Sequence, residues 1–152
     1  FGSFYLREKE SPIVCIAGGS GLAPIKALLE GGVLDQVERD VVFLFGARTQ
    51  EDLYCVDEIK KLKDKWNKNY KFDFIPVLNM EPKDSDWQGG RGLVTDYFEN
   101  EIIKKDNIDV SDWQGYLCGP PPMIDAACEV LEKHGIKSDE IFYDKFTDSR
   151  DL

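Results

Sequence analysis

The stretch "IVCIAGGSGLAPIKALL" (residues 13–29) contains the pattern of a strand, a turn and a helix in direct succession. Its apolar run Ile13–Ala17 is unbroken, which is typical of a central strand in a parallel sheet. The glycines that follow permit a tight turn, and the candidate helix Gly21–Glu30 begins at once. Pro24 lies in the first turn of that helix, where its missing amide costs nothing. The stretch therefore indicates one repeating unit of an α/β fold.

The same alternation continues outward along the chain. Further short runs of strand type are Val41–Phe45, Lys71–Leu78, Gly115–Cys118 and Glu140–Tyr143, and apolar residues at helical spacing lie between them. The alternation predicts an α/β fold, a doubly wound parallel five-stranded sheet with helices on both faces. Pro76 lacks an amide donor, so we expect the third strand at an edge. The predicted strand order is then 3-2-1-4-5.

Composition excludes several classes of function. The 152 residues carry a net charge of −10, without the clustered Lys and Arg of a nucleic-acid binder. No apolar run approaches the roughly 20 residues of a membrane span, so we expect no direct membrane contact. The four cysteines form no C-x-x-C pair and the chain has one histidine, His134, so no metal site is expected. Reduced thiols favour a cytoplasmic location.

The glycine-rich turn after the first strand is the first candidate site. Its spacing, Gly19-x-Gly21-x-x-Pro24, departs from the usual G-x-G-x-x-G by a proline in place of the third glycine. Amides at the following helix N-terminus face an anion in such units, which predicts a pyrophosphate cradle. The alternative is a merely tight connection between strand and helix.

The loop after the second strand, "FGARTQEDLY" (residues 45–54), is the second candidate. In a doubly wound fold this loop lies beside the adenosine half of a dinucleotide, where an acid accepts hydrogen bonds from the ribose 2′-hydroxyl and repels a 2′-phosphate. Glu51 and Asp52 are the candidate acids, and both also suit a helix N-terminus. Arg48 suits either a phosphate or adenine, or else a surface carboxylate.

The third candidate, "CGPPPM" (residues 118–123), follows the fourth strand. If that strand neighbours the first, this loop and the glycine turn flank the crevice at the switch point of the sheet. We then expect Gly119 to allow close approach and the Cys118 thiol to point into the crevice. The alternative for Cys118 is a small buried hydrophobe. The long irregular stretch Asn79–Gly90 is a further candidate for a functional loop.

Together these segments resemble the nicotinamide-binding domain of the ferredoxin–NADP reductase family. The matching segments, in order, are Gly18–Pro24, Gly46–Leu53, Trp87–Val94, Cys118–Met123 and the closing pair Asp144 and Phe146. Within the family, the chain is most similar to reductase components of bacterial multicomponent oxygenases, of the phenol hydroxylase and methane monooxygenase type. The flavin subunit of sodium-pumping NADH:quinone reductases is also similar.

The resemblance implies an NADH-binding domain that passes hydride from NADH to FAD, with electrons continuing through a 2Fe–2S centre to an oxygenase. FAD and the 2Fe–2S centre are expected only in missing N-terminal domains, which would be partners of this one. Residues 1–10 are then the end of a preceding FAD-binding domain or a linker, and residues 11–152 form the NAD(H)-binding domain. The alternatives are the corresponding domain of the quinone reductase, or a dinucleotide-binding module without electron transfer of its own.

The resemblance also implies roles for individual residues. Gly19, Ser20, Gly21 and Pro24 would shape the pyrophosphate site, Arg48 would contact the adenosine and Asp52 would select NADH. Cys118, Gly119 and Pro120 would line the nicotinamide pocket, and Phe146 would approach the flavin ring. The full set of implied cofactor-binding residues is Gly18, Gly19, Ser20, Gly21, Pro24, Arg48, Asp52, Cys118, Gly119, Pro120, Met123, Asp144 and Phe146, with Cys118 and Phe146 as the catalytic pair.

Overall fold

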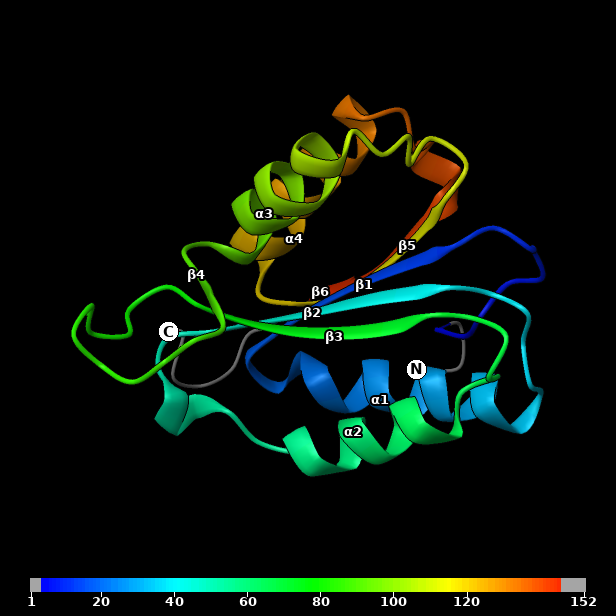
Figure 1. Cartoon of the computed structure of the whole chain (residues 1–152). Coiled ribbons are helices and arrows are strands. Elements are labelled where there is room, and N and C mark those ends of the chain that lie inside the picture. Colours follow the sequence, from blue (N-terminus) through cyan, green and yellow to red (C-terminus); the bar gives the residue numbers. More distant parts are fainter. Residues whose placement is uncertain (1–3, 146–152) are drawn as a thin grey trace.

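A computed structural model describes residues 4–145 as a parallel sheet covered by helices (Figure 1). The strands are β1 (Ile13–Gly18), β2 (Val41–Ala47), β3 (Phe72–Leu78), β4 (Gly90–Arg91), β5 (Gln114–Gly119) and β6 (Ile141–Lys145). Their order across the sheet is β4-β3-β2-β1-β5-β6, and every neighbouring pair is parallel.

The helices lie on both faces of this sheet, as the sequence predicts. α1 (Leu22–Leu34) and α2 (Val56–Lys65) cover one face, while α3 (Val94–Tyr97) and α4 (Pro121–Lys133) cover the other (Figure 1). α3 continues directly into the π-helical segment η3 (Phe98–Lys104), and the short 3₁₀ turns are η1 (Gly19–Gly21), η2 (Gln50–Asp52) and η4 (Ser138–Glu140).

β1 is buried along its whole length, because it lies between two cores. Ile13 and Cys15 pack into the core beneath α1 and α2, and Val14 and Ile16 pack into the core beneath α3 and α4. Successive side chains of a strand point to opposite faces, so a strand covered on both sides is apolar at every position. The apolar run Ile13–Ala17 is therefore unbroken because β1 lies at the centre of the sheet.

The prediction of a five-stranded sheet is wrong by one strand. The five expected strands are present in the expected order, but β4 adds a sixth beyond β3. β4 has only two residues, Gly90 and Arg91, which pair with Val77 and Leu78. β3 is therefore not an edge strand at its carboxyl end, although β4 pairs with none of its residues up to Pro76.

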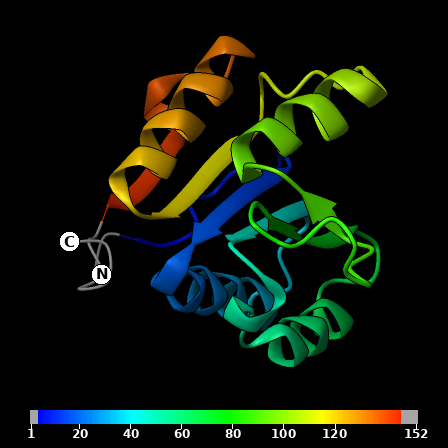
Figure 2. The ribbon, with the colours of Figure 1, turned by 90° about the vertical axis from the view of Figure 1, so that its left-hand side faces the viewer.

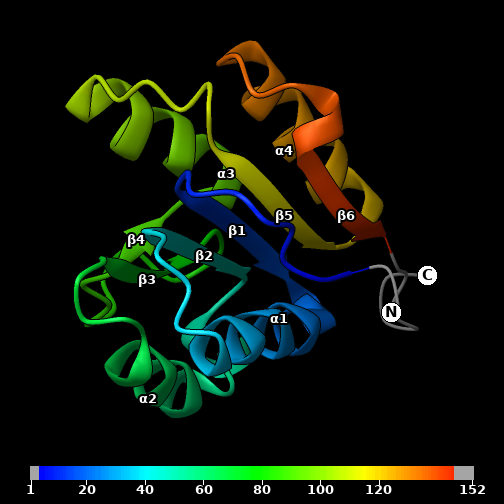
Figure 3. The same cartoon turned by 90° about the vertical axis from the view of Figure 1, so that its right-hand side faces the viewer.

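On the α1 side, β5 and β6 are covered in part by the N-terminal segment, residues 4–11, which lies beside α1 (Figure 3). The Phe4 ring lies edge-on to Tyr116 of β5, with 6.2 Å between ring centroids. Tyr116 in turn stacks on Phe142 of β6 at 5.2 Å. The resemblance implies that residues 1–10 are the end of a preceding domain or a linker. The described part of this segment, from Phe4 onward, packs on the sheet.

Because all strands are parallel, their carboxyl ends meet at one edge of the sheet. Figure 2 looks onto that edge, where η1 follows β1, η2 follows β2, and α4 begins directly after β5. Three segments that are far apart in the sequence are thus brought together. Of the helices in residues 4–145, none is both long enough and apolar enough to span a membrane.

Candidate cofactor site

A cavity of about 670 Å³ opens at the carboxyl edge of the sheet. Its volume lies within the usual range for small-molecule and cofactor sites. The lining residues come from the glycine turn, the loop after β2, the ends of β2 and β3, the segment before α3, and the start of α4. They include Gly18, Gly19, Ser20, Arg48, Glu51, Asp52, Tyr54, Asn79, Leu93, Pro120 and Met123.

The glycine turn brings the start of α1 close to the end of β5. Gly19 has φ +57°, a left-handed conformation that favours glycine. At Gly21 an added Cβ would overlap the backbone carbonyl of Cys118. Gly19 thus makes the turn, and Gly21 lets the N-terminus of α1 pack directly against the strand that ends beside it.

The first turn of α1 carries no group that would neutralise its positive end. No side chain caps it, and it contains no acidic residue. Ser20 and Ala23 of this region line the cavity. Partial positive charge at the N-terminus of a 13-residue helix therefore faces the cavity, where it favours an anion.

The N-terminus of α4 reaches the same cavity from the other core. Pro120 is its N-cap residue, again without a side-chain cap or an acid in the first turn. Pro120 and Met123 line the cavity. The N-termini of α1 and α4 thus meet at one hollow. Pro120, Pro121 and Pro122 have no amide hydrogen, so the free amides that favour an anion come from the start of α1.

The acidic end of the cavity lies in the loop after β2. Glu51, Asp52 and Arg48 all line it. The Asp52 carboxylate accepts hydrogen bonds from the Thr49 amide at 3.2 Å and from the Thr49 hydroxyl at 3.4 Å, a capping box around η2. Asp52 can therefore be both an acid at a helix N-terminus and an acid at the cofactor site, because its carboxylate caps a short helical turn and the residue also lines the cavity.

Tyr54 is a cavity residue that the sequence did not single out. Its hydroxyl donates a 2.7 Å hydrogen bond to the backbone carbonyl of Gly19. Its ring lies edge-on to Phe45, with centroids 5.6 Å apart. The one signal in the sequence is its place in the loop that contains Asp52, since a contact between two loops leaves no periodic pattern.

The long loop Asn79–Gly90 is anchored to the acidic end of the cavity. The Gln50 side chain donates to Glu81 at 2.6 Å and to Asp86 at 3.0 Å. The hydrogen bond from the Gln50 side chain to Glu81, with one from the Gln50 backbone amide, lowers the pKa of Glu81. The Arg91 guanidinium donates to the carbonyls of Glu81, Pro82 and Trp87 and to the Ser85 hydroxyl. The loop therefore has a fixed internal structure that holds η2 in place.

Cys118 does not lie where it was expected. Its side chain is buried and packs in the core beneath α1, and the residue does not line the cavity. Burial, with a smaller contribution from the Asp144 carboxylate, raises the pKa of the Cys118 thiol to about 12. The group is therefore a neutral thiol at ordinary pH, which matches the alternative of a small buried hydrophobe and not a nucleophile.

Four other residues implied by the resemblance also lie away from the cavity lining. Pro24 faces a second hollow of about 410 Å³ between α1 and the N-terminal segment. Gly21 and Gly119 shape the backbone beneath the cavity without lining it. Asp144, on β6, pairs in register with Cys118 of β5. Phe146 lies outside the described residues. Across residues 4–145, no cluster of His, Cys, Asp or Glu is suited to a metal ion.

The part of the chain that contains the cavity residues is similar to known proteins. A family model described as the oxidoreductase NAD-binding domain matches residues 15–129. The xylene/toluene monooxygenase electron transfer component XylA of Pseudomonas putida is 47% identical over 146 residues, which are 96% of this chain and 39% of that protein. The reductase component of propane 2-monooxygenase from Rhodococcus jostii is 40% identical, over 97% of this chain and 39% of that one.

Solved structures agree with this match. The cytochrome P450 reductase GcoB of Amycolatopsis superposes with a TM-score of 0.81 at 28% identity, covering 97% of this chain and 42% of that structure. The chain thus spans about two fifths of the length of these relatives.

Proposed function

The chain belongs to the oxidoreductase NAD-binding domain family, and we propose that it binds NADH as one domain of the reductase component of an oxygenase system. In this proposal the rest of the reductase, outside the sequence described, provides an FAD-binding domain and a 2Fe–2S domain, and an oxygenase accepts the electrons. Residues 11–152 form the NAD(H)-binding domain. The free thiols Cys15, Cys55, Cys118 and Cys128 suit a cytoplasmic protein.

The observation that carries the proposal is the uncapped N-terminus of α1 at a cavity that the start of α4 also lines. The pyrophosphate of a dinucleotide would lie against the start of α1, beside Gly19 and Ser20. The cavity volume of about 670 Å³ is sufficient for an extended cofactor of this kind.

The acidic end of the cavity supports NADH rather than NADPH as the ligand. A ribose 2′-hydroxyl near Asp52 would donate a hydrogen bond to its carboxylate, whereas a 2′-phosphate would be repelled. Two unit charges about 4 Å apart at a protein surface repel by about 4 kcal/mol before screening by salt. Glu51 lies at the same end and adds to that repulsion, while Arg48 would contact the adenosine.

NADH, when bound here, would supply a hydride for an FAD held by another part of the reductase. The residues of this chain would act by holding the dinucleotide in one orientation, because hydride transfer depends on alignment and exclusion of water. Pro120 and Met123 lie at the start of α4 and would contact the nicotinamide half. His134 is not available as an acid or base at the cavity, since it ends α4 and its Nε2 lies 2.7 Å from the carboxylate of Glu99.

Calorimetric titration of the protein with NADH and with NADPH tests this proposal. We expect one NADH per chain, with NADPH bound at least about tenfold more weakly, which corresponds to 1.4 kcal/mol. Equal affinities for the two cofactors, or no binding of either, would overturn it.

A further inference from the structure

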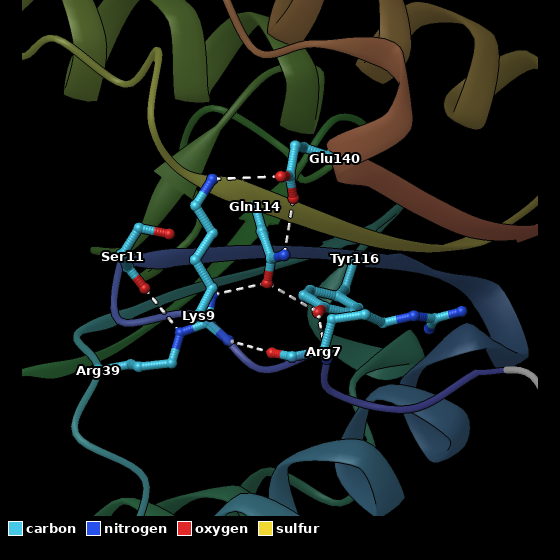
Figure 4. A network of polar contacts seen from close by, with 7 residues as sticks. All are labelled: Arg7, Lys9, Ser11, Arg39, Gln114, Tyr116 and Glu140. Carbon is cyan, nitrogen blue, oxygen red and sulfur yellow. Dashed lines mark hydrogen bonds and ion pairs between the residues drawn. The ribbon is translucent and has the colours of Figure 1, made fainter.

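A buried arginine holds the N-terminal segment at the edge of the sheet opposite the cavity (Figure 4). Arg39, in the connection between α1 and β2, is 3% exposed. Its Nε donates to the carbonyl of Ser11 at 2.6 Å, and its Nη1 donates to the carbonyl of Arg7 at 3.0 Å. Two backbone positions in one irregular segment are therefore fixed by a single guanidinium group.

Residues at the amino ends of β5 and β6 complete this polar network (Figure 4). The third guanidinium nitrogen of Arg39, Nη2, donates to the side-chain oxygen of Gln114 at 2.7 Å. The Gln114 amide nitrogen donates to Glu140 at 2.7 Å, and Glu140 pairs with Lys9 at 3.3 Å. The Tyr116 hydroxyl donates to the same Gln114 oxygen at 3.0 Å.

The Tyr116 hydroxyl also contacts the segment directly. It accepts a 2.9 Å hydrogen bond from the backbone amide of Arg7, whose carbonyl is held by Arg39. The Arg7 guanidinium lies over the Phe142 ring, 4.2 Å from its centroid. Both polar groups of the Arg7 backbone are thus bound by side chains of this domain, together with the Ser11 carbonyl.

This network is costly to build for a stretch without regular secondary structure. Burial disfavours a charged guanidinium and lowers the pKa of Arg39, and the charge is stabilised by hydrogen bonds from every nitrogen of the group. A flexible linker needs no such arrangement. Charge-assisted bonds to backbone carbonyls instead fix the path of the segment, whatever its own side chains are.

From the amino edge of the sheet, the segment turns back over the strands. From Ser11, at the amino end of β1, the segment runs along β5 and β6 to Phe4. Phe4 lines the same hollow as Pro24, which belongs to the first turn of α1. The described segment therefore extends from the amino edge of the sheet to Tyr116, near the middle of β5, and lies beside α1.

We propose that Arg39 is a positioning residue for hydride transfer. By fixing residues 7–11 it sets the orientation of the preceding flavin-binding part of the reductase relative to the cavity. The inference rests on the function proposed above. Hydride donor and acceptor must meet within about 3–3.5 Å, and an error of about 1 Å at a remote residue can reduce the rate about 100-fold.

The test uses the complete reductase with Arg39→Gln, and with Tyr116→Phe as a milder variant that keeps the packing of the ring. Flavin reduction is followed by stopped flow at saturating NADH, NADH affinity by titration, and the order of residues 4–11 by amide hydrogen exchange. Val110→Ala is the matched control, because Val110 is buried in the core on the opposite face of the sheet.

We expect Arg39→Gln to slow flavin reduction by about tenfold or more while NADH affinity changes less than about twofold. Amide exchange in residues 4–11 should become faster. Tyr116→Phe should also slow flavin reduction and speed amide exchange, but by less than Arg39→Gln does. Arg39→Lys keeps the positive charge, so its flavin reduction should be faster than that of Arg39→Gln. Val110→Ala should lower thermal stability and leave the rate at saturating NADH unchanged.

An unchanged rate in Arg39→Gln, with faster exchange in residues 4–11, would overturn the inference. A parallel fall in NADH affinity and rate would also overturn it, since that indicates general damage to the domain. If Arg39→Gln does not fold, Tyr116→Phe decides by the same criteria. If the unmodified reductase shows no NADH-dependent flavin reduction, the proposed function fails and this inference fails with it.

Discussion

The Tyr54 hydroxyl donates a hydrogen bond to the Gly19 carbonyl, and so joins the loop after β2 to the glycine turn after β1. These two segments hold the acidic end of the cavity and the start of α1, respectively. In the proposed complex they would contact opposite parts of one dinucleotide. The hydrogen bond therefore fixes the distance between two halves of the proposed site.

Tyr54→Phe should weaken NADH binding by about fivefold, because a hydrogen bond of this kind contributes about 1 kcal/mol. The ring contact with Phe45 is kept, and Tyr54 is 39% exposed, so thermal stability should change little. Titration of both proteins with NADH measures the effect. Tyr70→Phe, in the connection between α2 and β3, is the control and should bind NADH normally. Unaltered affinity in Tyr54→Phe would show that this contact does not organise the site.

Asp52→Ser should narrow the preference for NADH over NADPH. Removing the carboxylate removes repulsion of a 2′-phosphate and also a hydrogen-bond acceptor for the ribose, so NADPH affinity should rise and NADH affinity fall. We expect the ratio of the two dissociation constants to shrink by about tenfold or more. Asp57→Ser, an exposed acid in the first turn of α2, should leave the ratio unchanged. If both variants behave alike, Asp52 does not select the cofactor.

Gly21→Ala and Gly31→Ala form a matched pair within one turn–helix unit. At Gly21 the added methyl would overlap the Cys118 carbonyl, so we expect a loss of about 1–3 kcal/mol in the free energy of unfolding. At Gly31, inside α1, a Cβ would meet nothing within 4 Å, so alanine should stabilise the protein by about 0.5–1 kcal/mol. Urea denaturation measures both. Equal effects at the two positions would contradict the close packing of α1 on β5.

Acid should destabilise the protein partly through Glu99. Its carboxylate accepts hydrogen bonds from His134 at 2.7 Å and Lys133 at 3.0 Å, which lower its pKa from 4.5 to about 2. A carboxyl whose pKa is depressed on folding stabilises the protein above its unfolded pKa, and this contribution is lost as the pH falls through the folded value.

Glu99→Gln should therefore cost about 1 kcal/mol at neutral pH, a fall of about 3 °C in Tm. The difference between variant and parent should disappear as the pH falls from about 4.5 to about 2. Glu101→Gln, on the same helix but 51% exposed, is the control. A constant difference in Tm across this pH range would show that the Glu99 interaction is not the cause.

Most of the fold follows from local pattern in the sequence. The run Ile13–Ala17 predicts a central strand because both faces of β1 are covered. Gly135, with φ +96°, follows α4 in the left-handed conformation that glycine favours after a helix. β4 could not be predicted, because two residues are too few to show the alternating pattern of a strand. Its position is set instead by the loop that Arg91 organises through contacts to the carbonyls of other residues.

The site was predictable as a set of loops but not as a set of side-chain directions. Cys118 lies two residues after Tyr116, so both point to the α1 face of β5, and the thiol is buried there. The sequence placed Cys118 at the correct end of the correct strand without indicating which face its thiol would take. The Tyr54–Gly19 contact was not predictable at all, because it depends on how β1 and β2 lie side by side.

NADH should occupy the cavity that the starts of α1 and α4 both line. NMR titration of backbone amides with NADH tests it most directly. We expect saturating NADH to shift the amide signals of Gly19, Ser20 and Gly21 and those of the loop around Asp52, while the amide signal of Gly135, at the far end of α4, stays unchanged. Binding of NADH without shifts in the glycine turn, or no binding at all, would contradict it.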